Sequence, residues 1–171
     1  MFTFDIIEQY EDSGIIESAV RDCIVPATNS VSHLEVDTDE DSIIAHWKGI
    51  SLGIIDKDEG RFIKSYYNDE LLGYGFGEVK THEGQDIFYA VGGFYGNING
   101  SRKYAFKADW WVALAEHIKG MGFEQLWFSV RRDSTLESCC KIVDPKLSYT
   151  CVFEDDPDTN LAEYKLFKIT L

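Results

Sequence analysis

The sequence predicts an α/β or α+β domain built on a mixed β-sheet, and three observations support this. From residue 61 onward, short apolar runs bounded by Gly, Asn and Asp alternate with two segments of helical periodicity. The chain has 171 residues, a length that suits one domain with a sizeable core better than two. Only three prolines and no Pro/Gly/Ser-rich linker interrupt it, so we expect a single domain over residues 1–171.

The central part of the chain predicts three strands joined by short turns. Residues 61–67 (RFIKSYY) and 71–79 (LLGYGFGEV) are two apolar runs that form a hairpin. The Asn-Asp-Glu sequence at 68–70 makes the turn, because Asn and Asp tolerate a left-handed backbone. A second turn at 81–85 (THEGQ) leads into a third strand over 86–94 (DIFYAVGGF).

Two helices flank the next strand. Apolar residues recur at spacings of three and four over 106–121, which predicts a helix with one buried face. A buried strand over 124–130 (EQLWFSV) follows directly. Ser134 and Glu137 then have the S-x-x-E spacing of a capping box, which opens a short helix that runs to Val143.

The C-terminal end of the chain has strand patterns, whereas the N-terminal end has a broken helical pattern. Strands are expected over 147–153 and 164–171, separated by an acidic turn at 154–160. Apolar residues from Ile6 to Val25 have a loosely helical spacing that is broken near Asp12, Ser13 and Gly14.

Charge excludes several partners. The chain carries 16 Lys and Arg against 30 Asp and Glu, a formal net charge of −14. Nucleic acids and anionic membranes both need clustered basic side chains, so we expect neither as a direct partner. No apolar run is long enough to span a bilayer, and the N-terminus has no basic segment followed by an apolar one. A cytoplasmic protein is therefore expected.

The cysteines predict neither a disulfide framework nor a metal site. Cys23, Cys139, Cys140 and Cys151 form no CxxC pair, and the four histidines stand alone in the sequence. We expect reduced thiols, as in a cytosolic protein, and no bound metal. The acidic stretch 35–41 lacks the glycine and the final Glu of a calcium loop, so a solvated loop is expected there.

The residues Asn68 to Tyr74 (NDELLGY) and the order of elements from 86 to 143 resemble the GNAT family of N-acetyltransferases. Asp133-Ser134-Thr135 lies where relatives begin their fourth helix with Asn. The resemblance implies a GNAT-like mixed, mostly antiparallel sheet flanked by helices, with a core over 61–171 and a divergent part over 1–60. A weaker resemblance links the aromatic-rich strand and the final YKLFKITL to GNAT-like internal virion proteins of short-tailed phages.

The family resemblance implies acetyl-coenzyme A as the cofactor and places its pyrophosphate in the loop before the long helix. In relatives, a Q/R-x-x-G-x-G/A loop offers backbone N–H groups there, helped by the helix dipole. In this chain Phe106 and its neighbours replace the glycines of that pattern. Two interpretations stay open: a solvated strand-to-helix connection, or a divergent phosphate loop formed by Asn97, Asn99, Gly100, Ser101, Arg102 and Lys103.

Catalytic candidates follow from the same resemblance. Relatives protonate the coenzyme A thiolate with a Tyr seven residues after the helix-opening Asn, and that count reaches Cys140 here. Tyr149 on the following strand is the alternative donor. Relatives often use a Glu on the third or fourth strand as base, for which Glu78 and Asp86 are candidates. His117 falls on the apolar helix face and is expected to be a core or boundary residue.

Two functions are therefore predicted. The first is transfer of an acetyl group from acetyl-coenzyme A to a primary amine, and the acidic surface suits a cationic acceptor such as a polyamine, an aminoglycoside or a lysine side chain. The second is a catalytically degenerate protein that keeps the scaffold and binds a protein partner, as a phage virion or assembly component or as an acidic inhibitor.

Overall fold

The computed structural model describes residues 1–7, 21, 41–42, 45, 60–96, 107–133, 135–155 and 164–171. Alternating apolar residues form the strands of the described part, and amphipathic segments form its helices. In chain order these are β1 (Phe2–Ile7), β2 (Gly60–Tyr67), β3 (Glu70–His82), β4 (Gln85–Gly96), α5 (Ala108–Gly120), β5 (Gln125–Arg131), α6 (Thr135–Val143), the 3₁₀ turn η2 (Asp144–Lys146), β6 (Thr150–Asp155) and β7 (Tyr164–Thr170).

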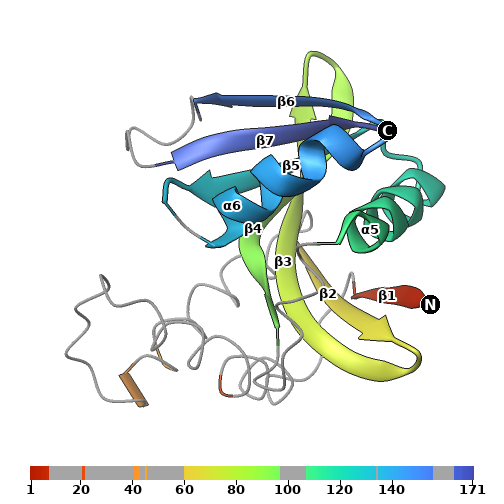
Figure 1. The fold of residues 1–171 in the computed structure, drawn as a ribbon, viewed down its shortest axis with the longest axis vertical. Coiled ribbons are helices and arrows are strands. Elements are labelled where there is room, and N and C mark those ends of the chain that lie inside the picture. The colour runs from red at the N-terminus through yellow and green to blue at the C-terminus, as the bar shows by residue number, and fades with distance from the viewer. Residues whose placement is uncertain are drawn as a thin grey trace.

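The described strands form one seven-stranded sheet in the order β1-β2-β3-β4-β5-β7-β6 (Figure 1). Five of the six neighbouring pairs are antiparallel, and β4 and β5 are parallel. Because parallel strands need a crossover, α5 connects β4 to β5. The expected mixed, mostly antiparallel sheet flanked by helices is confirmed.

The strands and helices predicted from residue 61 onward are confirmed with shifted ends. β3 and β4 are longer than predicted, since their hairpin continues to the turn at Glu83 and Gly84, which both have positive φ. The turn between β2 and β3 also has the expected left-handed backbone, with φ of 49° at Asn68 and 65° at Asp69. The turn predicted from Asn68 and Asp69 is therefore confirmed.

The N-terminus differs from the helical interpretation. Ile6 and Ile7 end strand β1, which pairs antiparallel with β2 from Phe2↔Tyr67 to Ile7↔Phe62. Phe4 is buried in the core, and Phe2 and Ile6 pack against that core. Side chains in this segment alternate between the two faces of the sheet, as in any strand. The prediction of a helix was therefore wrong at Ile6 and Ile7. Of the rest of Ile6–Val25, the structure describes only Arg21.

Both helices cover one face of the sheet. Trp111 of α5 is fully buried, with its ring 4.9 Å from that of Phe128 and 5.8 Å from that of Phe167. The neighbouring Trp110 meets Phe4 of β1 at 6.0 Å instead. These edge-on aromatic contacts join α5 to three strands. We call this side of the sheet the helix face.

The opposite side, which we call the outer face, has its own apolar cluster. It consists of Ile87, Tyr89, Trp127 and Leu166, all of them buried. Two lysines lie over its rings: Lys80 Nζ is 4.1 Å from the centre of the Tyr89 ring, and Lys168 Nζ is 4.2 Å from Trp127. The aliphatic stems of these lysines cover apolar surface, and their amines pair with Glu78 and Glu154.

Candidate functional site

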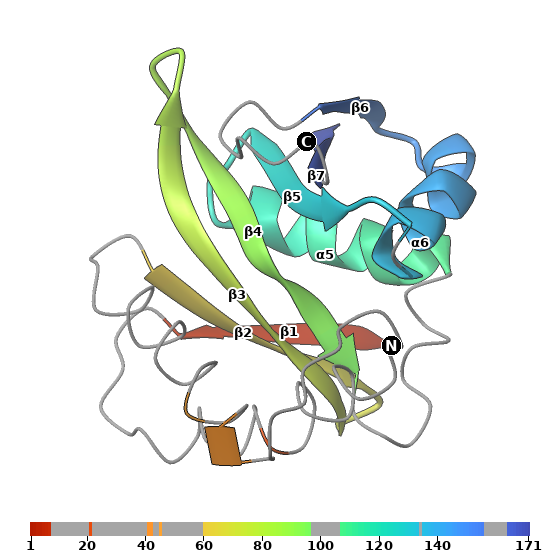
Figure 2. The ribbon, with the colours of Figure 1, turned by 90° about the vertical axis from the view of Figure 1, so that its left-hand side faces the viewer.

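The parallel strands β4 and β5 separate toward their carboxyl ends. Their pairing is confined to Phe88↔Leu126, Tyr89↔Trp127 and Ala90↔Phe128, although β4 continues to Gly96 and β5 to Arg131. Figure 2 shows the two strands running together and then diverging toward their arrowheads. Past Ala90 the edge of β4 that faces β5 is therefore not part of the β4–β5 ladder. Carboxyl ends of parallel strands are a common place for ligands.

The separation has a local cause in β4. Between the pairs Gly77↔Ala90 and Phe76↔Gly92, β3 advances by one residue and β4 by two. From Phe76↔Gly92 to Tyr74↔Tyr95, β3 advances by two and β4 by three. Each extra β4 residue is a bulge, which bends and twists the strand away from its neighbour. The Val-Gly-Gly sequence at 91–93 suits these bulges, because glycine within a strand often marks one.

Helix α5 is the next described element in the chain after the carboxyl end of β4. Its N-cap residue, Lys107, has an extended backbone and makes no side-chain capping hydrogen bond. A helix start that lacks such a cap offers N–H groups and the positive end of the helix dipole to an anion. The predicted phosphate-loop residues at 97–103 lie outside the described residues, so the loop stays a prediction.

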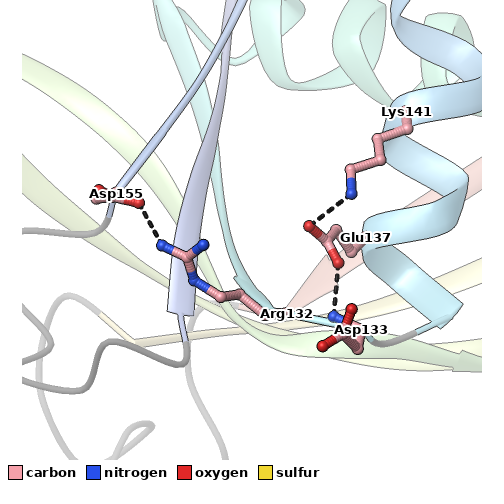
Figure 3. A network of polar contacts seen from close by, with 5 residues as sticks. All are labelled: Arg132, Asp133, Glu137, Lys141 and Asp155. Carbon is pink, nitrogen blue, oxygen red and sulfur yellow. Dashed lines mark hydrogen bonds and ion pairs between the residues drawn. The ribbon is translucent and has the colours of Figure 1, made fainter.

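A polar network holds the turn between β5 and α6 (Figure 3). The backbone N–H of Asp133 donates to Glu137 Oε2 at 2.5 Å, and Lys141 Nζ lies 2.8 Å from Glu137 Oε1. Arg132 Nη2 donates to Asp155 Oδ1 of β6 at 2.6 Å. Glu137 is 5% exposed, and its pKa is lowered by the hydrogen bond from Lys141, assisted by the Asp133 N–H and the charge of Lys165. Glu137 is therefore ionised near neutral pH.

Glu78 lies on the outer face, close to the point where the strands separate. It pairs with Tyr89 across β3 and β4, next to the Gly77↔Ala90 pair that precedes the first bulge. Its side chain is 16% exposed, and Lys80 Nζ is 3.1 Å from its Oε1. Asp86, the other acidic candidate, is exposed near the hairpin tip and accepts a hydrogen bond from Thr81 at 3.0 Å. Of the two, Glu78 is nearer to the separation.

Cys140 is in the core on the helix face. It is fully buried, and burial raises the pKa of its thiol far above the ordinary value. The adjacent Cys139 is 1% exposed, and burial raises its pKa to about 11. Neither cysteine forms a disulfide, and Cys151 is also free. A neutral, enclosed thiol at position 140 behaves as an apolar filler.

Tyr149 precedes β6, at the end of the sheet where β5 has its amino end. Thr150, the next residue, pairs with Thr170, and Thr170 pairs with Gln125 at the amino end of β5. The Tyr149 hydroxyl donates to Glu116 of α5. Burial, and then that carboxylate, raise the pKa of Tyr149 to about 12.

The structure therefore does not bring the three catalytic candidates together. Glu78 is on the outer face, Cys140 is in the core of the helix face, and Tyr149 is beside the start of β6, at the end of the sheet where β5 has its amino end. His117 is half-buried with its ring 5.8 Å from that of Phe4, as expected for a boundary residue, and burial lowers its pKa. The roles assigned to Glu78, Cys140 and Tyr149 stay predictions.

The sequence analysis did not predict the bulges of β4 or the N–H group that Glu137 accepts. The bulges of β4 were signalled by Gly92 and Gly93 within an otherwise apolar strand. The capping-box spacing did identify Glu137, but its carboxylate bonds the N–H of Asp133, one residue before the N–H that the motif specifies. Over the described ranges, no group of three or more His, Cys, Asp and Glu side chains is arranged so that it could hold a metal ion. None of the helices found there is long and apolar enough to cross a membrane.

Comparisons with known proteins identify the fold. No protein family model matches the chain, and no curated protein sequence matches it. Solved structures do. PaiA N-acetyltransferase from Thermoplasma acidophilum, in complex with coenzyme A, aligns over 99% of both chains with 14% identity and a TM-score of 0.58.

Two further structures agree. FdhC, a nucleotide-linked sugar GNAT, aligns over 99% of this chain and 86% of its own, with 17% identity and a TM-score of 0.57. RimL, a ribosomal L7/L12 α-N-protein acetyltransferase in complex with coenzyme A, aligns over 99% of this chain and 93% of its own, with 12% identity and a TM-score of 0.55. The chain thus has the GNAT fold. These matches lend no support to the resemblance to phage virion proteins.

Proposed function

We propose that the protein is an N-acyltransferase that moves an acetyl group from acetyl-coenzyme A to a primary amine. The observation that carries the proposal is the separation of β4 and β5 after Ala90, within a GNAT fold. Separated parallel strands leave backbone donors and acceptors on their facing edges, and an extended amide-containing ligand can pair with such edges.

The described residues fit an acyl-coenzyme A. Its pantetheine arm contains amides that can pair with the edge of β4 beyond Ala90, and its pyrophosphate suits the start of α5, where the N-cap residue Lys107 makes no side-chain capping hydrogen bond. Arg102 and Lys103, which precede α5 in the sequence, would add positive charge in a chain of net charge −14. The start of α5, where the pyrophosphate would bind, is on the helix face. Acetyl-coenzyme A would therefore enter the gap between β4 and β5 from that face.

Glu78 is the base that this arrangement favours. The acceptor amine would approach from the outer face, opposite the helices, and Glu78 lies on that face beside the start of the separation. Acetyl-coenzyme A supplies a thioester: the N–C bond forms, the C–S bond breaks, the amine loses a proton and the thiolate gains one. Glu78 would accept the amine proton, while Lys80 holds its carboxylate in place.

The proton donor to the thiolate is proposed to be Cys140 or Tyr149. Cys140 would have to become exposed and Tyr149 would have to leave Glu116, because the structure encloses the first and bonds the second. Cys140→Ala and Tyr149→Phe decide between them, since loss of the true donor lowers kcat and loss of the other residue does not.

Calorimetric titration with acetyl-coenzyme A tests the donor site. The expected result is binding that becomes at least about tenfold weaker in an Arg102→Ala, Lys103→Ala double variant, because charge-assisted contacts to phosphate are lost. A Lys119→Ala, Lys146→Ala variant removes the same charge from exposed positions and should bind normally. Absence of binding by the unmodified protein at millimolar ligand contradicts the proposal.

A non-catalytic scaffold is the second candidate. The enclosed thiol of Cys140, at the position where the family resemblance places a Tyr proton donor, favours it. Such a protein would bind a protein partner, as an assembly component or an acidic inhibitor. Binding of acetyl-coenzyme A without release of free thiol, in the presence of spermidine, kanamycin or a lysine peptide, would support this candidate over the enzyme.

A further inference from the structure

The turn that leads from β5 into α6 has an unusual conformation. Asp133 has φ of 59°, in the left-handed region, which Asp tolerates better than most residues with a Cβ. The turn starts just beyond Arg131, the last residue of β5. It therefore stands at the carboxyl end of the strand, after β5 has separated from β4 at Phe128.

Glu137 holds this turn from inside the protein. One oxygen of its carboxylate accepts the N–H of the left-handed Asp133, and the other pairs with Lys141 one helical turn later (Figure 3). Arg132, the neighbouring turn residue, is bonded to Asp155 at the end of β6. The turn is thus tied to α6 on one side and to the sheet edge on the other.

Stability alone is a weak reason for a buried carboxylate at position 137. Burial of a charge opposes its ionisation, and an apolar side chain of similar size often stabilises a core as well as an ion pair does. What an apolar side chain cannot do is accept the N–H of Asp133. The specific consequence of Glu137 is therefore the position of the turn, and with it the end of β5.

We propose that Glu137 is a positioning residue for acyl transfer, which sets where the carboxyl end of β5 lies relative to β4. The inference rests on the proposed function, because the separation between these strands is the proposed donor site. Glu137 touches neither donor nor acceptor. It acts through the Asp133 N–H, so its loss shifts the donor within the site rather than removing a binding contact.

The test compares two substitutions of nearly equal size. Glu137→Met fills the same space but accepts no hydrogen bond, whereas Glu137→Gln keeps an oxygen that can accept the Asp133 N–H. We expect kcat to fall by about tenfold in Glu137→Met with a smaller change in KM for acetyl-coenzyme A, because small displacements of reacting groups reduce rate more than binding. Glu137→Gln should keep kcat within about threefold of the unmodified protein.

Two controls separate positioning from general damage. Lys141→Met removes the exposed partner of Glu137 but leaves the Asp133 bond, so its kcat should fall less than that of Glu137→Met. Glu154→Gln removes a carboxylate that pairs with Lys168 elsewhere in the sheet, and should keep normal kcat. Amide hydrogen exchange in a peptide that spans residues 129–134 should speed up in Glu137→Met and not in Glu137→Gln, a readout that requires no activity.

The outcomes distinguish the two proposals. Wild-type kcat in Glu137→Met, or equal losses in Met and Gln variants, overturns the positioning role while leaving the proposed function intact. Absence of acetyl-coenzyme A binding by the unmodified protein overturns the proposed function and this inference with it. Lower kcat and faster amide exchange in Glu137→Met, with neither change in Glu137→Gln, support the proposed function and the positioning role.

Discussion

At the scale of single residues, small side chains allow close packing between strands. Gly77 on β3 faces the ring of Phe88 on β4. A Cβ added at Gly77 would lie 2.5 Å from Phe88 Cε1 and 2.7 Å from Cζ. Phe88 is fully buried, so its ring has little room to move. Glycine at this position therefore serves the packing of the core next to the candidate site.

Gly77→Ala is expected to destabilise the protein by about 1–3 kcal/mol, because the extra methyl group overpacks the core against Phe88. Urea unfolding followed by circular dichroism measures the change. Gly120→Ala is the matched control, since a Cβ there meets nothing within 4 Å and Gly120 ends α5. Equal stability of the two variants would contradict the close contact at Gly77.

At the scale of elements, contacts between neighbours decide what each side chain can do. Tyr149 precedes β6, yet its hydroxyl is bonded to Glu116 in the third turn of α5. Glu137 similarly joins α6 to the end of β5. In isolated helices or strands these side chains would be solvated. Their hydrogen bonds and pKa values therefore depend on contacts between two elements.

The Tyr149 contact predicts a pH dependence at the alkaline end. The folded-state pKa is raised from the ordinary value of 10 to about 12, first by burial and then by Glu116. The neutral phenol is thus favoured by folding. Its contribution to stability is complete below pH 10 and is lost as the pH rises from 10 toward 12.

Glu116→Gln removes the acidic partner and should lower the Tyr149 pKa, which leaves burial as the remaining cause. Stability should then fall less steeply between pH 10 and 12 than in the unmodified protein. Urea unfolding at several pH values measures the slope. In a Tyr149→Phe background the same substitution should leave the slope unchanged, and a persistent difference there would assign the effect to another group.

At the scale of the whole molecule, one core joins both helices to the sheet. It includes Trp111 and Leu114 of α5, Cys139 and Cys140 of α6, and Phe167 of β7. Side chains from distant parts of the chain enclose one another there. Access to any of them requires that the common core opens.

Thiol labelling tests this enclosure. At pH 8, iodoacetamide should alkylate Cys139 and Cys140 at least about 100-fold more slowly in the native protein than in urea, because both are enclosed and protonated. Cys151, which is only half-buried, should react at an intermediate rate, although its pKa is also raised to about 11. Peptide mass spectrometry resolves the three sites, and rapid native labelling of Cys140 would show that the core opens around it.

The sequence by itself determined the elements and their order from residue 61 onward. Local signals carry that information: alternation in 61–67, helical spacing in 106–121, and Asn68-Asp69 at a turn that needs a left-handed backbone. The carboxylate of Glu137 was also visible in advance, because a capping box depends on residues three apart.

Only the tertiary structure decided which of the candidate side chains lie together. Glu78, Cys140 and Tyr149 are separated because strand register and crossover direction assign them to different faces and ends of the sheet. Likewise, β1 pairs with β2 across more than 50 residues, and the separation of β4 from β5 depends on bulges measured against β3. Such pairings join residues that are distant in sequence, so no local periodicity records them.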